Sequence, residues 1–62
     1  MTVTLRDFIG KVFTGRGRKL RIEAISGEMC WAWDCLREDR IVFPVRLLID
    51  GWRRGRLVME GR

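Results

Sequence analysis

The sequence contains no histidine and no tyrosine, and only two of its 62 residues are cysteines. Histidine is the side chain that most often transfers protons in enzymes, so its absence removes the usual general acid–base residue. Structural zinc sites take four Cys or His ligands, and two thiols cannot supply them. The adjacent carboxylates of Glu38 and Asp39 fall in a polar turn, and the glycines and lysines of GKVFTGRGRK are in the wrong order for a phosphate-binding loop. We therefore expect a protein that is not an enzyme and that binds no metal or cofactor.

Long apolar runs are also missing, because no stretch approaches the roughly 18 residues that a membrane span requires. The N-terminal MTVTLRDF lacks the basic start and the apolar centre of a signal peptide. Two cysteines without a secretion signal are typical of free thiols in a reducing compartment. These features predict a cytoplasmic location and no association with membranes.

The residues that are present have the composition of a globular protein. Hydrophobic residues make up 47% of the chain and charged residues 34%, and there is a single proline. The length predicts one small globular domain over residues 1–62. A domain of this size buries only about 60% of its unfolded surface, so we expect its stability to be marginal. Association with a partner subunit would add to that stability.

Hydrophobic periodicity divides the chain into helical and extended segments. In residues 4–14 the apolar side chains follow helical spacing, with Thr4 as the N-cap and Gly15 as the end of the helix. Residues 18–26 alternate between apolar and charged side chains, as a half-buried strand does. Further predicted segments are strands at 29–36 and 41–43, a helix from Pro44 to about Gly55, and a short edge strand at 56–60.

Together these segments predict a fold of the α+β class, in the order α-β-β-β-α-β. We expect a small three- to four-stranded antiparallel sheet with an N-terminal helix and a second helix after the third strand. No repeat, linker or low-complexity segment interrupts the chain. The sequence leaves open which face of the sheet each helix covers.

The two central strands are joined by SGEM, in which Gly27-Glu28 fits a two-residue hairpin loop of the type II′ form. This loop predicts a register that sets Ser26, Ala24, Ile22 and Leu20 opposite Met29, Trp31, Trp33 and Cys35, respectively. Arg21 then lies opposite Asp34, and this opposite-charge pair favours the same alignment. In this register Met29, Trp31, Trp33 and Cys35 form one inward face, and a one-residue slip would turn both tryptophans to the other side.

The stretch MCWAWDC, residues 29–35, gathers two thiols and two indole rings. On a regular strand Cys30 and Cys35 have opposite parity and lie roughly 16 Å apart. A disulfide needs Cα atoms within about 7 Å, so we expect two free thiols, with Cys35 in the core. Trp31 and Trp33 share a face, as base-stacking aromatic residues do. The predicted register makes that face the apolar one, which favours the core for both rings, and helical spacing favours it for Trp52.

Basic residues outnumber acidic ones by 13 to 8, which gives a formal net charge of +5. All but two of the basic residues are arginines, which bind phosphate and guanine with paired hydrogen bonds. A GC-rich genome would enrich arginine equally. Two clusters stand out, at 15–21 and 53–56, and if they lie at one end of the sheet they form one phosphate-binding patch. The candidate binding residues are Arg16, Arg18, Lys19, Arg21, Arg53, Arg54 and Arg56.

These features favour a small basic binding protein that is not an enzyme and that contacts nucleic acid or a nucleoprotein through its arginines. The alternative is an accessory protein of a phage or mobile element that binds and inhibits a host protein, as anti-CRISPR proteins do. Small size and the lack of catalytic residues favour this alternative, but no motif supports it. A third possibility is a homodimer that buries the strand face of Cys30, Ala32 and Leu36.

Overall fold

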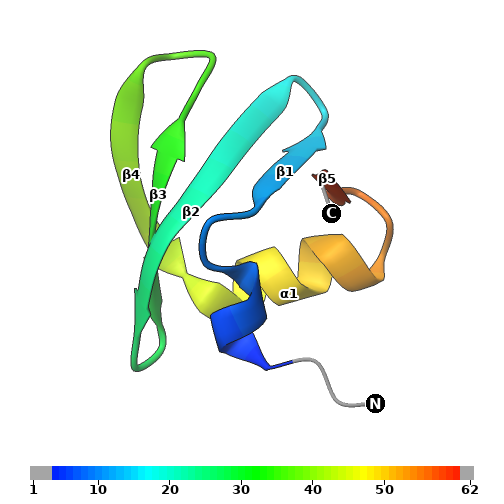
Figure 1. Cartoon of the computed structure of the whole chain (residues 1–62). Coiled ribbons are helices and arrows are strands. Elements are labelled where there is room, and N and C mark those ends of the chain that lie inside the picture. The colour runs from blue at the N-terminus through cyan, green and yellow to red at the C-terminus, as the bar shows by residue number, and fades with distance from the viewer. Residues whose placement is uncertain (1–3, 61–62) are drawn as a thin grey trace.

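The computed structural model describes residues 4–60, which form five strands, one α-helix and one turn of 3-10 helix. The 3-10 helix η1 (Leu5–Phe8) leads into strand β1 (Val12–Gly15). Strands β2 (Arg18–Ser26), β3 (Met29–Asp34) and β4 (Asp39–Pro44) follow. Helix α1 (Val45–Arg53) and the short strand β5 (Val58–Glu60) complete the described chain (Figure 1).

The strands form one antiparallel sheet in the order β4-β3-β2-β1-β5. After β4 the chain continues directly into α1, which packs across one face of the sheet before β5 returns to pair with β1 (Figure 1). The amide of Val45 donates to the carbonyl of Glu28 at 2.8 Å, which ties the start of α1 to the β2–β3 turn. We call the sheet face beneath α1 the inner face and the opposite face the outer face.

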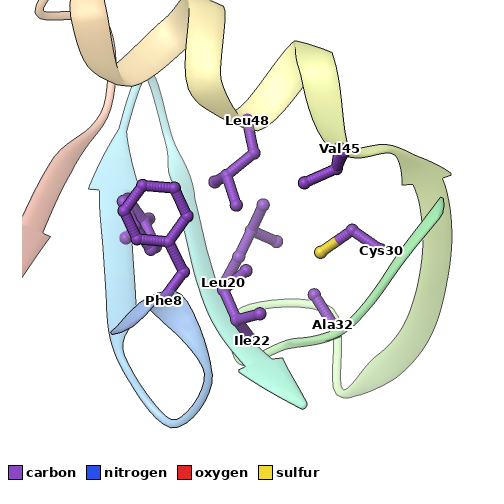
Figure 2. Packing of buried hydrophobic residues seen from close by; sticks show 8 residues of the cluster. Phe8, Leu20, Ile22, Cys30, Ala32, Val45 and Leu48 are labelled. Atoms are coloured by element: carbon purple, nitrogen blue, oxygen red, sulfur yellow. The ribbon is translucent and has the colours of Figure 1, made fainter. Parts of the chain in front are cut away.

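The hydrophobic core lies between the inner face and α1. Its buried side chains are Phe8, Phe13, Leu20, Ile22, Cys30, Ala32, Val45 and Leu48. Figure 2 shows Val45 and Leu48 of α1 above residues of β2 and β3, among which Cys30 and Ala32 are small enough to leave room for the helix. Phe8 packs edge-to-face against Phe13 and Trp52, with ring centroids 5.4 and 5.2 Å away. Residues of η1 and of the end of α1 therefore complete the core.

The predicted N-terminal helix over residues 4–14 is wrong. Only Leu5–Phe8 are helical, although Thr4 does stand at the N-cap, where its amide donates to Asp7 Oδ2 at 3.0 Å. Gly10 has a φ of 86°, outside the helical region, and the segment beyond it pairs with β2 and β5 as β1. That segment is rich in β-branched and aromatic residues, which suit a strand. Phe8 lies in η1 and Phe13 lies in β1, and both side chains are buried in the same core. Apolar residues of two different elements therefore imitate the spacing of a single helix.

The predicted fold class is therefore wrong in its elements. Within residues 4–60 the structure has a five-stranded sheet and a single α-helix where we expected three or four strands and two helices. The strand at 18–26, the helix after Pro44 and the C-terminal edge strand are present. The main source of the error is residues 12–15, which we predicted as the end of the first helix. In the structure they form β1, the strand with which β5 pairs.

The β2–β3 hairpin follows the predicted register only near its turn. Ser26 pairs with Met29 and Ala24 with Trp31, but a β-bulge at Glu23 then shifts the alignment by one residue. As a result Ile22 lies opposite Ala32, Leu20 opposite Asp34, and Arg21 opposite Trp33. The predicted pairs of Ile22 with Trp33, Leu20 with Cys35 and Arg21 with Asp34 are wrong. The inner face of β3 consists of Cys30, Ala32 and Asp34, not of the predicted Met29, Trp31, Trp33 and Cys35.

The strand face that we expected in a homodimer is already covered in the folded chain. Cys30 and Ala32 are 0% exposed beneath α1, whereas Leu36 lies in the β3–β4 turn and is 60% exposed. These three residues therefore do not form the common surface that we expected a second copy to bury. The assignment of Cys35 to the core is wrong, because Cys30 is the buried thiol.

Helix α1 ends in a Schellman motif. The amide of Gly55 donates to the carbonyl of Trp52 at 3.1 Å, and that of Arg56 donates to the carbonyl of Gly51 at 2.8 Å. This turn places Leu57 against Gly51 and directs the chain back toward β1. Within residues 4–60, no helix has the length and apolar character needed to cross a membrane.

Candidate nucleic-acid interface

The two arginine clusters of the sequence meet at one end of the sheet. Arg16 and Gly17 form the β1–β2 turn, with φ values of 48° and 74° that fit a type I′ hairpin. The loop between α1 and β5 passes beside this turn (Figure 1). The two segments touch so closely that a Cβ atom on Gly15 would collide with the carbonyl oxygen of Arg56. We call this region the basic end, with Arg16, Arg18, Arg53, Arg54 and Arg56 as its charged residues.

The other two predicted binding residues, Lys19 and Arg21, lie elsewhere. Both belong to the outer face of β2, whereas Arg18 has the parity of the inner face and lies at the rim of a hollow beneath it. All seven predicted residues are exposed. The structure therefore brings five of them to one end of the molecule and places two on the adjoining sheet surface.

Arg54 is the residue of the basic end that has an acidic partner. Its Nε donates to Asp50 Oδ1 at 2.9 Å across one turn of α1. The two side chains are 62% and 53% exposed, so the ion pair is screened by solvent and contributes about 0.3–0.5 kcal/mol. A phosphate can therefore replace Asp50 as the partner of this guanidinium at little energetic cost.

Trp31 and Trp33 lie on the outer face of β3, on the side opposite to the prediction. Both rings are half-buried, and neither belongs to the core or to the apolar residues packed against it. Trp52, in contrast, packs against the core as predicted. Across the neighbouring strands, Trp31 is flanked by Ala24 and Val42, and Trp33 is flanked by Arg21 and Arg40.

Arg40 is held in place by the residue that forms the β-bulge. Its Nε donates to Glu23 Oε1 at 2.9 Å, which engages one of the five N–H donors of the guanidinium. The Arg40 side chain is 64% exposed, so this contact orients the group without burying it. The bulge at Glu23 thus has two effects: it turns the tryptophans to the outer face, and it supplies the carboxylate that orients Arg40 beside Trp33.

Sequence reasoning missed both Arg40 and the position of the tryptophans. A usable signal is the alternation of small and large residues in Cys30, Trp31, Ala32 and Trp33. A helix that packs closely on a sheet favours small side chains beneath it, which assigns Cys30 and Ala32 to the inner face. The hydrophobic parity of β2 masked this signal, because Leu20, Ile22 and Ala24 alternate as if no bulge were present.

Asp34 organises the turn that leads into β4. Its side chain is buried, and Oδ1 accepts hydrogen bonds from the amides of Leu36 and Arg37, both at 3.1 Å. The carbonyl of Asp34 accepts a third bond, from the amide of Glu38, at 2.8 Å. The nearby Glu38 and Asp39 are exposed. Asp34 therefore serves the structure of the turn and, through it, the position at which β4 presents Arg40.

The two thiols lie in different environments. Cys30 is buried, and its burial raises the pKa of the thiol above the ordinary value of 9.0. Cys35 is half-buried at the start of the β3–β4 turn, and both cysteines are free. In the part of the chain that the structure describes, no group of three or more Cys, His, Asp and Glu side chains is arranged to hold a metal ion.

An apolar hollow opens between the inner face, α1 and the segment before β5. Its volume is about 350 Å³, and its apolar lining includes Leu20, Ile41, Phe43, Leu47 and Leu57. Leu47 is 56% exposed at the rim. The hollow can accept an apolar side chain of a partner protein, but it contains no cluster of polar groups that would orient a small molecule.

The chain was compared with models of protein families, with curated proteins and with solved structures, and no match was found in any of the three. The chemical groups of the basic end and of the outer face are therefore the basis on which a function is proposed.

Proposed function

We propose that this protein is a small, non-enzymatic nucleic-acid-binding protein that contacts phosphates through its basic end. The observation that carries this proposal is the backbone contact between Gly15 and Arg56, because it joins two arginine clusters, at 15–21 and 53–56, that lie far apart in the chain. A patch of guanidinium groups attracts the phosphate backbone and releases its condensed counterions. Arg18, Arg53 and Arg56 supply exposed charges of this kind, and Arg16 stands at the tip of the adjoining turn.

The net charge supports the same proposal. A formal charge of +5 on 62 residues favours encounters with polyanions and raises the association rate at low salt. The cytoplasm is the compartment that we propose for this activity, because both cysteines are free thiols. The target is a nucleic acid, either alone or as the exposed strand of a nucleoprotein.

The test is a fluorescence-polarisation titration of labelled single-stranded and duplex oligonucleotides at several salt concentrations. We expect micromolar binding at about 50 mM salt, weakening steeply as salt rises. The variant Arg16→Gln/Arg56→Gln removes two charges from the basic end. For a single strand, each lost phosphate contact lowers the slope of log K against log salt by about 0.7, so we expect a decrease of about 1.4.

The matched control is Arg6→Gln/Arg46→Gln, which removes two exposed arginines that lie outside the basic end. Arg6 lies in η1, and Arg46 lies in the first turn of α1, at the opposite end of the helix from the basic end. We expect this variant to keep the wild-type slope within about 0.5. Absence of binding by the wild-type protein contradicts the proposed function, and an equal loss in both variants contradicts the proposed site.

The apolar hollow supports a second candidate, which is the binding and inhibition of a host protein by an accessory protein of a phage or mobile element. A hollow lined by Leu47 and Phe43 suits an apolar side chain of a protein partner rather than a phosphate. Capture from a lysate with and without nuclease separates the two candidates. Capture of one protein that survives nuclease and is lost in Leu47→Asp favours this second function.

A further inference from the structure

We propose that the outer face of the sheet is a stacking platform for unpaired bases, with Trp33 as its central ring, so that the ligand is a single-stranded nucleic acid. This inference rests on the proposed function, which requires only phosphate contacts at the basic end. It adds the class of nucleic acid and assigns a second, distinct set of binding residues. These residues are Lys19, Arg21, Trp31, Trp33 and Arg40.

The two indole rings lie on the side of the sheet away from α1. Core side chains from β2 and β3 point toward α1, as Figure 2 shows for Leu20, Ile22, Cys30 and Ala32. Trp31 and Trp33 occupy the alternate positions of β3 and therefore lie on the side away from α1. Two positions along a strand are about 7 Å apart, so the rings stand side by side on one surface. Phe8 of η1 and Val45 and Leu48 of α1 belong to the buried core, to which neither tryptophan belongs.

Trp33 lies between two basic residues of the neighbouring strands. The residues directly opposite it in the sheet are Arg21 in β2 and Arg40 in β4. Side chains at such paired positions have Cβ atoms about 5 Å apart, so both guanidinium groups are within reach of the backbone of a nucleotide whose base contacts the indole. Arg40 is oriented by Glu23 and is 64% exposed. The arrangement of an aromatic ring between cations is complementary to a base between phosphates.

The outer face is continuous with the basic end through Lys19. Lys19 lies two residues before Arg21 and therefore shares the outer face with it. Lys19 pairs with Thr14, one residue from Gly15, where the α1–β5 loop touches the sheet. Basic side chains therefore extend along the outer face from the basic end, through Lys19 and Arg21, to Trp33. A strand whose phosphates are held at the basic end would continue onto the rings of the outer face.

A single strand fits this surface better than a duplex. In a duplex the faces of the bases are covered by their neighbours, and only their edges are accessible in the grooves. The outer face is built from strands, and α1 packs on the opposite side, so it presents no helix to a major groove. A second copy of the chain is a poorer occupant, because facing copies would bring Lys19, Arg21 and Arg40 toward the same cations of the partner.

The test compares a labelled oligothymidylate of about 12 nucleotides with a duplex of equal length. We expect Trp33→Val to weaken binding of the single strand by about 5- to 150-fold and to leave duplex binding within about twofold. Trp33→Phe keeps an aromatic ring and should retain most of the affinity. Leu36→Ala is the matched control, since Leu36 is an exposed apolar residue outside the platform, and it should bind as the wild type does.

Indole N–H resonances give a readout that needs no destabilised variant. On addition of the oligothymidylate to wild-type protein, the signals of Trp31 and Trp33 should shift more than that of Trp52, which packs against Phe8 and precedes Arg53 of the basic end. Individual Trp→Phe variants assign the three signals. Shifts confined to Trp52, or equal affinity of Trp33→Val and wild type for the single strand, would overturn the platform.

The outcomes separate this inference from the proposed function. If wild-type protein binds neither oligonucleotide, both fail. If the basic-end variant weakens binding while Trp33→Val does not, the proposed function stands and the stacking platform is wrong. If light scattering shows a wild-type dimer that Trp33→Val converts to a monomer with unchanged oligonucleotide affinity, the occupant of the outer face is a second copy and the inference is overturned.

Discussion

At the scale of single residues, Asp34 shows how one buried side chain determines the geometry of a loop. Asp34 is 5% exposed, and its carboxylate serves as acceptor for two consecutive backbone amides. A buried amide that loses its partner costs about 1–3 kcal/mol. We expect Asp34→Ala to lower the free energy of unfolding by about that amount, measured by urea titration with circular dichroism.

The control for this prediction is Asp34→Asn, which keeps a side-chain oxygen at the Oδ1 position. The amide can accept the same two hydrogen bonds, although neutral acceptors form weaker bonds than a carboxylate. It should therefore lose less than half of what the alanine variant loses. Equal stability of Asp34→Ala and the wild type would show that the turn does not depend on this carboxylate.

At the scale of elements, the bulge at Glu23 decides which side chains face the core. Leu20 and Ile22 lie on the inner face before the bulge, and Ile25 does so after it, which requires one extra residue between them. Deletion of Glu23 makes the alternation regular and keeps every core residue on the inner face. We expect this deletion variant to remain folded, with a loss of at most about 1 kcal/mol from the ion pair with Arg40.

Deletion of Arg21 is the matched comparison, because it also removes one charged residue from β2. It makes Leu20 adjacent to Ile22, so that the two side chains can no longer share a face. The exposure of a buried Leu costs about 1.5–3 kcal/mol, and we expect cooperative unfolding at a markedly lower urea concentration, or no folded state. If deletion of Glu23 proves the more damaging of the two, the observed register is wrong.

The same element separates what the sequence could predict from what it could not. The limits of β2, the loop at Gly27-Glu28, and the helix that begins after Pro44 follow from local patterns and are present in the structure. The bulge has no signature within β2 itself, because Leu20, Ile22 and Ala24 alternate without interruption and mask the small and large alternation of β3. The strand β1 also depends on distant partners, since it pairs with β5 from the other end of the chain. The bulge explains why the predicted face of the tryptophans is wrong. The pairing of β1 with β5 explains why the predicted first helix is wrong.

The candidate binding residues show the same division. Arginine clusters are visible in the sequence, and the structure places five of the seven predicted residues at one end of the sheet. The contact between Gly15 and Arg56 that joins them is tertiary, and only the return of β5 to β1 creates it. Arg40 was not predicted because its role depends on two tertiary facts, its pairing with Trp33 and its contact with Glu23.

At the scale of the whole molecule, one small core supports both the basic end and the outer face. Natural domains have about 0.05–0.15 kcal/mol of stability per residue, which amounts to about 3–9 kcal/mol for a chain of this length. Leu48 is fully buried at the centre of the contact between α1 and the sheet (Figure 2). Replacement of a buried Leu by Ala costs about 2–5 kcal/mol. We expect Leu48→Ala to be partly or largely unfolded at room temperature, as measured by thermal and urea unfolding.

Leu47→Ala provides the control, since it makes the same substitution one position earlier in the same helix. Leu47 is 56% exposed, so little apolar surface is lost from the core, and alanine has the higher helix propensity. Its stability should stay within about 0.5 kcal/mol of the wild type. A similar loss in both variants would mean that α1 does not pack on the sheet through Leu48. In that case the inner and outer faces could not be distinguished, and the assignment of Trp31 and Trp33 to the outer face would fail.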